Sequence, residues 1–141
     1  MGAVSSIDKA QQVYDLMQGY AYRHAATYFT QDKILFTDVQ ADSTQLPHEY
    51  ALIKQVNTAL EPATVSGSKR RQLCTLIVEF NVLNAHTSQG RALQTAFTHH
   101  MSAESFSQHD VAIDSITTND YTNTRGTKYV TVIDFNYFVR V

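Results

Sequence analysis

Histidine and cysteine are the residues of this sequence best suited to metal or nucleophilic chemistry. The histidines fall in no HExxH or HxH arrangement, and Cys74 is the only cysteine, so no thiol pair supports a zinc site. His99 and His100 are adjacent in a predicted helix and point about 100° apart; we expect one partly buried and one solvated imidazole. Cys74 falls on the apolar face of a predicted strand, where we expect a buried, inert thiol. We therefore predict no metal ion.

The motifs that mark common enzyme classes are also missing from the sequence. There is no GxSxG, no P-loop and no GxGxxG, and the carboxylates form no close local pair. The one basic run is Lys69-Arg70-Arg71. Aromatic residues are not interleaved with it, so it favours a solvated loop or a partner-facing patch over a nucleic-acid site. We predict a protein that is not an enzyme and that holds no cofactor.

Length and composition indicate a single globular domain spanning residues 1–141. Of the 141 residues, 43% are hydrophobic and 17% are charged. The formal net charge of -2 gives no general electrostatic reason to expect nucleic-acid binding. No apolar run approaches the ~20 residues that a membrane span needs, so we predict no membrane partner.

Hydrophobic periodicity predicts the secondary structure. Apolar residues at three- and four-residue spacing predict a helix from Ser6 to about His24, and a second helix capped by Thr87 or Ser88. Alternation predicts strands at 33–39, 72–82, 111–116 and 128–141. The segment 50–57 fits either a helix or a strand. We favour a strand, because Pro62 and Gly67 limit any helical extension.

The order of these elements predicts an α+β fold: a mostly antiparallel sheet of four to five strands packed by two helices. The polar run 119–126 predicts a long hairpin tip that joins the last two strands. A helix connects the strand at 72–82 to the strand at 111–116. A crossover of that length permits a parallel pair there but does not require one.

Two predicted strands carry apolar residues on both faces. On the second face of 72–82, Leu73 and Ile77 stand beside Glu79; on that of the last strand, Val130, Val132 and Phe138 share a face with Asp134, Asn136 and Arg140. Either a helix covers these residues or they form a subunit interface. In the second case Ile77 and Phe138 supply apolar contact, and Glu79, Asp134 and Arg140 set the register between subunits.

The succession of elements resembles the tail terminator (tail completion) proteins of long-tailed bacteriophages, including the lambda type. The resemblance is architectural and covers residues 6 to 141. It rests on the N-terminal helix, the long strand 71–82, the polar turn 84–87, the helix that opens with Ser88-Gln89-Gly90-Arg91-Ala92, and the last strand 128–137. The long polar segment 40–48 departs from the pattern.

This resemblance implies a homo-oligomeric ring, usually a hexamer, at the head-proximal end of the tail in the virion, assembled in the host cytoplasm. Its partners are the tail tube protein and the head-tail connector protein, and DNA passes through its lumen without specific binding. The stretches 57–71 and 119–127 are then candidate contact loops. Their candidate contact residues are Lys69, Arg70, Arg71, Asp120, Tyr121 and Arg125.

Two alternatives remain open. The first is a small-molecule-binding or hydrolytic domain with the cone fold that resembles nuclear transport factor 2. It requires a deep apolar pocket with a His/Asp pair, His24 or His109 with Asp134. The second is an adaptor or immunity-type domain that binds one partner as a monomer. Stoichiometry distinguishes the adaptor from the ring.

Overall fold

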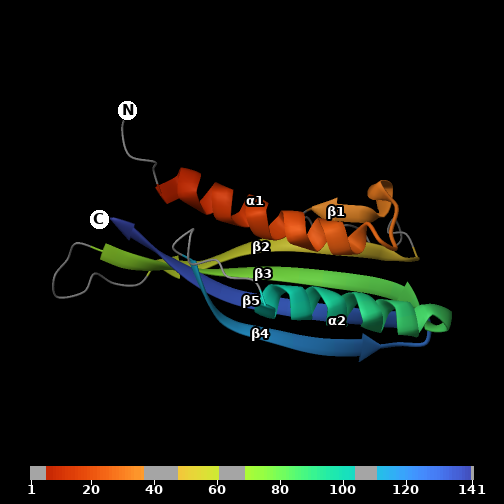
Figure 1. The fold of residues 1–141 in the computed structure, drawn as a ribbon. Coiled ribbons are helices and arrows are strands. Elements are labelled where there is room, and N and C mark those ends of the chain that lie inside the picture. Colours follow the sequence, from red (N-terminus) through yellow and green to blue (C-terminus); the bar gives the residue numbers. More distant parts are fainter. Residues whose placement is uncertain (1–5, 37–47, 61–68, 104–110, 141) are drawn as a thin grey trace.

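The structure, a computed structural model, describes residues 6–36, 48–60, 69–103 and 111–140, with side chains for 15–36, 48–56, 71–103 and 111–137. Over these ranges two α-helices pack on a five-stranded sheet (Figure 1). The elements are α1 (Ser6–Ala25), η1 (Gln31–Lys33), β1 (Ile34–Phe36), β2 (Tyr50–Leu60), β3 (Lys69–Leu83), η3 (Asn84–His86), α2 (Thr87–Ala103), β4 (Val111–Thr122) and β5 (Gly126–Arg140).

The sheet has the strand order β1-β2-β3-β5-β4. Only the short edge pair β1–β2 is parallel; the pairs β2–β3, β3–β5 and β5–β4 are antiparallel. The predicted α+β fold with a mostly antiparallel sheet is therefore confirmed. The parallel pair that the α2 crossover permitted does not form, because β5 lies between β3 and β4. The ambiguous segment 50–57 is a strand, as predicted.

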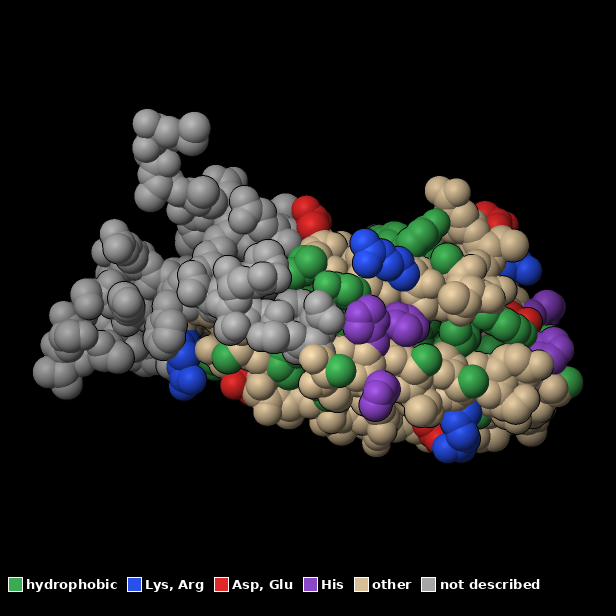
Figure 2. Space-filling view, in the orientation of Figure 1, with side chains coloured by type: hydrophobic (Ala, Val, Ile, Leu, Met, Phe, Trp, Pro, Cys, Tyr) green, Lys and Arg blue, Asp and Glu red, His purple; other side chains and the backbone are tan. Residues whose placement is uncertain are grey.

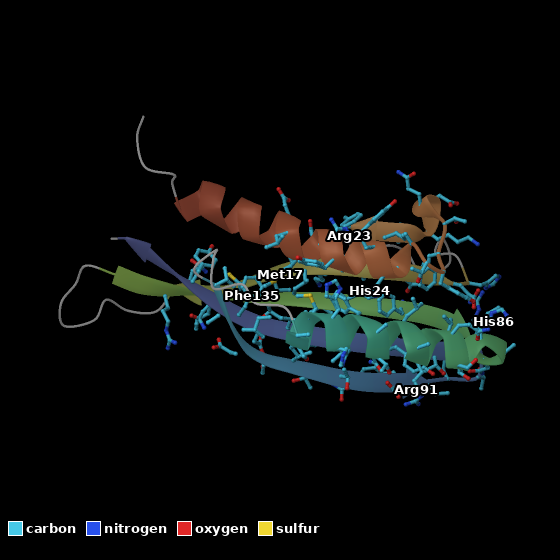
Figure 3. The ribbon with its side chains drawn as sticks, viewed as in Figure 1. Met17, Arg23, His24, His86, Arg91 and Phe135 are labelled. Atoms are coloured by element: carbon cyan, nitrogen blue, oxygen red, sulfur yellow. The ribbon has the colours of Figure 1, made fainter. Side chains whose placement is uncertain are left out.

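One face of the sheet carries the core, and both helices cover that face. Successive strand residues point to opposite faces, so alternate residues of β3 and β5 face the helices. The buried core residues are Met17, Ala21 and Ala25 of α1, Phe29 after it, Leu93, Phe97 and Met101 of α2, and Ile34, Ala51, Ile53, Cys74, Leu76, Val78, Phe80, Val82, Val111, Tyr129, Ile133, Phe135 and Tyr137 of the sheet. Met17 and Phe135 lie between α1 and the sheet (Figure 3). The burial predicted for Cys74 is confirmed.

Both helices form where periodicity predicted them, but the predicted cap at Thr87 or Ser88 is wrong, because α2 begins at Thr87 and the Thr87 backbone is already helical. α1 ends at Ala25, one residue beyond the predicted end, and Gly19 does not interrupt it. Of the two adjacent histidines in α2, His99 is exposed and His100 is partly buried, as expected. Gly90 allows α2 to approach the sheet closely: a Cβ atom there would lie 2.6 Å from Cε2 of Tyr129. The strand predicted at 33–39 is described only over Ile34–Phe36; residues 37–39 lie outside the described chain.

The predicted long hairpin tip at 119–126 is wrong. β4 continues to Thr122, and the turn comprises only residues 123–125. Asp120 and Tyr121 pair in register with Tyr129 and Lys128 of β5. The polar composition of 119–122 is compatible with a strand because β4 lies at the edge of the sheet, where most of its side chains are exposed to solvent.

Candidate interaction surface

The face of the sheet opposite the helices, here called the open face, is the main candidate surface. No helix of the described chain covers it; α1 and α2 lie together on the other side (Figure 1). Its apolar side chains include Leu52 and Val56 of β2, Leu73 and Ile77 of β3, and Val130 and Val132 of β5. Val130 is buried, and the other five are partly buried. Of the two explanations for these residues, coverage by a helix is thus excluded within the described ranges.

Asp134 lies on the open face and is held by hydrogen bonds from both neighbouring strands. Thr75 Oγ1 donates to Asp134 Oδ1 at 2.7 Å, and Ser115 Oγ donates to Asp134 Oδ2 at 3.2 Å. Close by, Asn136 Nδ2 donates to Asp114 Oδ1 at 2.7 Å. The predicted contact residue Asp134 is therefore a carboxylate fixed in position within its own chain.

Glu79 and Ile77 lie in adjacent rows of the same face. Glu79 is flanked across the strands by Leu52 and Val130, and its Oε1 lies 3.4 Å from Nζ of Lys128. The Glu79 side chain is 17% exposed, and that of Lys128 is 43% exposed. An ion pair of this exposure contributes about 1 kcal/mol or less to stability, so its main effect is to position the two charges. Ile77 is partly buried between Lys54 and Val132.

The other predicted interface residues are placed only by their backbones. Phe138 and Arg140 pair in register with Arg71 and Lys69 at the far end of β3 and β5. Their side chains, and those of Lys69 and Arg70, lie outside the described residues. His109 also lies outside them.

Most of the described residues of the predicted contact loops 57–71 and 119–127 belong to strands, and residues 61–68 lie outside the described chain. Lys69, Arg70 and Arg71 belong to β3, and Asp120 and Tyr121 belong to β4; only Arg125 lies in a turn. Asp120 faces the helix side, where Nη2 of Arg91 lies 3.1 Å from its Oδ2. Figure 3 shows Arg91 extending from α2 toward β4. Tyr121 lies on the open face and is 59% exposed.

A cluster around Glu49 was missed by the sequence analysis. Glu49 accepts hydrogen bonds from Tyr28 Oη at 3.0 Å and from the backbone N–H of Leu83 at 3.0 Å, and Nδ1 of His86 lies 2.7 Å from its Oε2. Burial acts to raise the pKa of Glu49, but its interactions with His86, Leu83 and Tyr28 outweigh burial and lower it. Burial and the Glu49 carboxylate raise the pKa of Tyr28 to about 12. No local pattern reveals this cluster, because its members are distant in sequence.

The His/Asp pair required by the cone-fold alternative does not form between His24 and Asp134. His24 lies between the helices (Figure 3), with its Nε2 2.8 Å from Nδ1 of His100. Asp134 lies on the opposite side of the sheet, among Thr75 and Ser115. In the helix-side view, histidines cluster over the helices and at one end of the molecule (Figure 2).

Over 15–36, 48–56, 71–103 and 111–137, where side chains are described, no group of three or more His, Cys, Asp or Glu is placed to hold a metal ion. Neither of the two helices described has the length and hydropathy that a bilayer crossing requires.

Comparison with known proteins gives no family for this chain. No protein-family model matches the sequence, and no curated protein matches it. A function must therefore be argued from the surface itself.

Proposed function

We propose that this protein is a structural protein of the bacteriophage virion, a tail terminator. It forms a ring, with six copies as the expected number, on the head-proximal end of the tail tube. The ring ends polymerisation of the tube and provides the surface to which the head-tail connector attaches. DNA passes through the lumen without specific binding, in line with the formal net charge of -2.

The composition of the open face is the observation that supports this proposal most. An antiparallel sheet with one solvated face usually carries polar residues on that face. Here β2, β3 and β5 place apolar side chains on it, including Leu52, Ile77 and Val132, beside charged ones. Apolar surface mixed with positioned polar groups is typical of protein–protein interfaces. The open face is therefore suited to contact with another protein.

A ring also needs two unlike surfaces on each subunit. In head-to-tail contacts, one surface of each copy meets a different surface of the next copy, and the ring closes when the rotation allows it. The open face and the helix-covered side (Figure 2) are two such surfaces. The fixed carboxylates Glu79 and Asp134 give the open face defined charges that select one register.

Native mass spectrometry of the purified protein, alone and mixed with tail tubes, tests the proposal. We expect a sixfold mass, or assembly only on tube ends visible by electron microscopy. Ile77→Asp places a charge in the apolar part of the open face, so the variant should lose assembly while its circular dichroism stays that of the folded protein. Gln31→Asp, in the exposed turn η1 beside the edge strand β1, is the matched control and should assemble normally.

Three outcomes would count against the ring. A protein that stays monomeric and never binds tail tubes contradicts it outright. A monomer that binds one partner protein in a one-to-one complex supports the adaptor alternative. Equal loss of assembly in Ile77→Asp and Gln31→Asp would remove the open face as the interface.

A further inference from the structure

A row of four side chains crosses the open face near the β4–β5 turn. Tyr50 is paired with Asn81, Asn81 with Lys128, and Lys128 with Tyr121, each on a neighbouring strand. Adjacent strands are about 4.8 Å apart, so the four side chains stand next to one another on one face. Two tyrosine rings thus flank an amide and an ammonium group.

A cavity of about 410 Å³ lies over this row. Volumes of roughly 300–1,000 Å³ are usual for sites that bind small molecules. Besides the row, its lining includes His48 and Arg125, together with Val82, Thr122, Asn123, Gly126 and Thr127. Three of these described lining residues, His48, Arg125 and Lys128, carry basic side chains, and none carries a carboxylate. The cavity therefore favours an anion.

The turn that carries Arg125 is held in place by hydrogen bonds. Oδ1 of Asn123 accepts from the N–H groups of Arg125 at 2.8 Å and of Gly126 at 2.9 Å. Asn84 Nδ2 donates to the carbonyl oxygens of Asn123 and Thr124, which ties the turn to η3. The Arg125 guanidinium contacts the His48 ring. The basic groups are thus positioned before a ligand arrives, which lowers the entropic cost of binding.

Asn81 adds a second, independent observation. Its Nδ2 atom is buried and has no hydrogen-bond partner among the described residues. Buried amide groups are normally paired, and one left unpaired costs stability. Asn81 lines the cavity next to Lys128, so a rotation of its side chain that exposes this amide would allow it to donate to an oxygen atom of a bound ligand.

We propose that this cavity binds the phosphate group of a small ligand. Lys128 and Arg125 supply the positive charge, Asn81 supplies an N–H donor, and the rings of Tyr50 and Tyr121 flank the remainder of the ligand. Charge-assisted hydrogen bonds from two cations match a phosphate, which carries up to two negative charges. This site goes beyond the ring function. Because it lies at one end of the open face, where a neighbouring subunit of a ring would cover it, the titration is also made on the Ile77→Asp variant, which should not assemble.

Titration of the ¹⁵N-labelled full-length protein, followed by NMR at constant ionic strength, tests the site. The probes are inorganic phosphate and adenosine monophosphate, with sodium chloride as the reference salt. We expect saturable shifts of the amides of residues 122–128. Lys128→Gln should weaken binding about tenfold or more, because a charge-assisted contact is lost. Lys54→Gln, on the same face but outside the cavity, should bind like the wild type.

Lys128→Gln removes the cation from the cavity and also breaks the ion pair with Glu79. A second variant distinguishes these two effects. Glu79→Gln breaks the same pair and leaves the cation, so it should bind phosphate at least as tightly as the wild type. Tighter binding of adenosine monophosphate than of phosphate supports contact of its base with a tyrosine ring; equal binding supports a site for the phosphate group alone.

The site would be overturned by the absence of saturable shifts with either probe. Lys128→Gln binding like the wild type, or Glu79→Gln losing binding as Lys128→Gln does, would also overturn it. Binding of a single-stranded oligonucleotide with no binding of either small phosphate would assign the surface to nucleic acid instead. None of these outcomes depends on the native mass, so failure of the ring proposal and failure of this site are distinguishable.

Discussion

Nε2 of His24 lies 2.8 Å from Nδ1 of His100, and this contact joins α1 to α2. One of the two nitrogens must donate and the other accept, so the contact cannot survive with both rings fully protonated. Burial, and after it the charge of His100, lowers the pKa of His24 from its usual value of 6.5. Tyr20 packs edge-on against His100, and Phe97 packs against His24. The helix contact is therefore built around a neutral His24.

The free energy of unfolding should decrease as pH is lowered through the range where His24 titrates. The unfolded chain takes up the His24 proton near pH 6.5, whereas the folded chain takes it up only at lower pH. The unfolded state then binds more protons, so stability is complete above about pH 6.5 and is lost as pH falls through the lower folded pKa. Urea unfolding measured at several pH values above about 5, where most carboxylates stay ionised, checks this.

The matched variants for the pH experiment are His24→Gln and His99→Gln. His24→Gln should flatten the dependence of stability on pH over this range. His99, which is exposed on α2 next to His100, should leave the dependence unchanged when it is replaced. A pH dependence in His24→Gln as steep as that of the wild type would show that His24 is not its source.

Removal of the Glu49 carboxylate should destabilise the fold. Glu49→Ala leaves the N–H of Leu83 and the hydroxyl of Tyr28 without their acceptor, at a cost of about 1–3 kcal/mol. Tyr28→Phe removes only one donor and should cost about 0.5–1.5 kcal/mol. Chemical denaturation measures both free energies of unfolding. Equal stability of Glu49→Ala and the wild type would mean that the cluster contributes nothing.

Two glycines should respond in opposite ways to replacement by alanine. At Gly90 a Cβ atom would lie 2.6 Å from Tyr129 Cε2 and 2.8 Å from Val82 Cγ2, so Gly90→Ala should destabilise by about 1–3 kcal/mol despite a better helix propensity. At Gly19 no atom lies within 4 Å of such a Cβ, so Gly19→Ala should stabilise by about 0.5–1 kcal/mol. Thermal unfolding of the two variants checks the signs, and the same sign for both would contradict this packing.

The element order and the core face were predictable because each depends on local periodicity. The alternation Cys74, Leu76, Val78, Phe80 indicated a strand with one buried face, and these residues are buried. Whether a helix also covers the second face was not predictable, since apolar residues on both sides of a strand do not show how the two helices divide between the faces. The open face therefore became an interface candidate only once α1 and α2 were placed.

The features that sequence analysis missed all depend on contacts between distant residues. Asp120 and Tyr121 look like turn residues by composition, yet pairing with Tyr129 and Lys128 makes them a strand. Glu49 follows a polar segment with no motif, and its partners Tyr28 and His86 lie 21 and 37 positions away. The phosphate cavity likewise requires the registers of four strands, which no local pattern fixes.

The position of β5 between β3 and β4 constrains the order in which the chain can fold. β3 and β5 pair along all fifteen residues of each, so one edge of β3 stays open on the ribosome until β5 has been made. β4 is synthesised before β5, but β5 is the strand with which β4 pairs in the sheet. Both β4 and β5 therefore join the sheet only after β5 has been made. Such non-local pairing is slow, and until it is complete a long strand edge remains available for pairing with other chains.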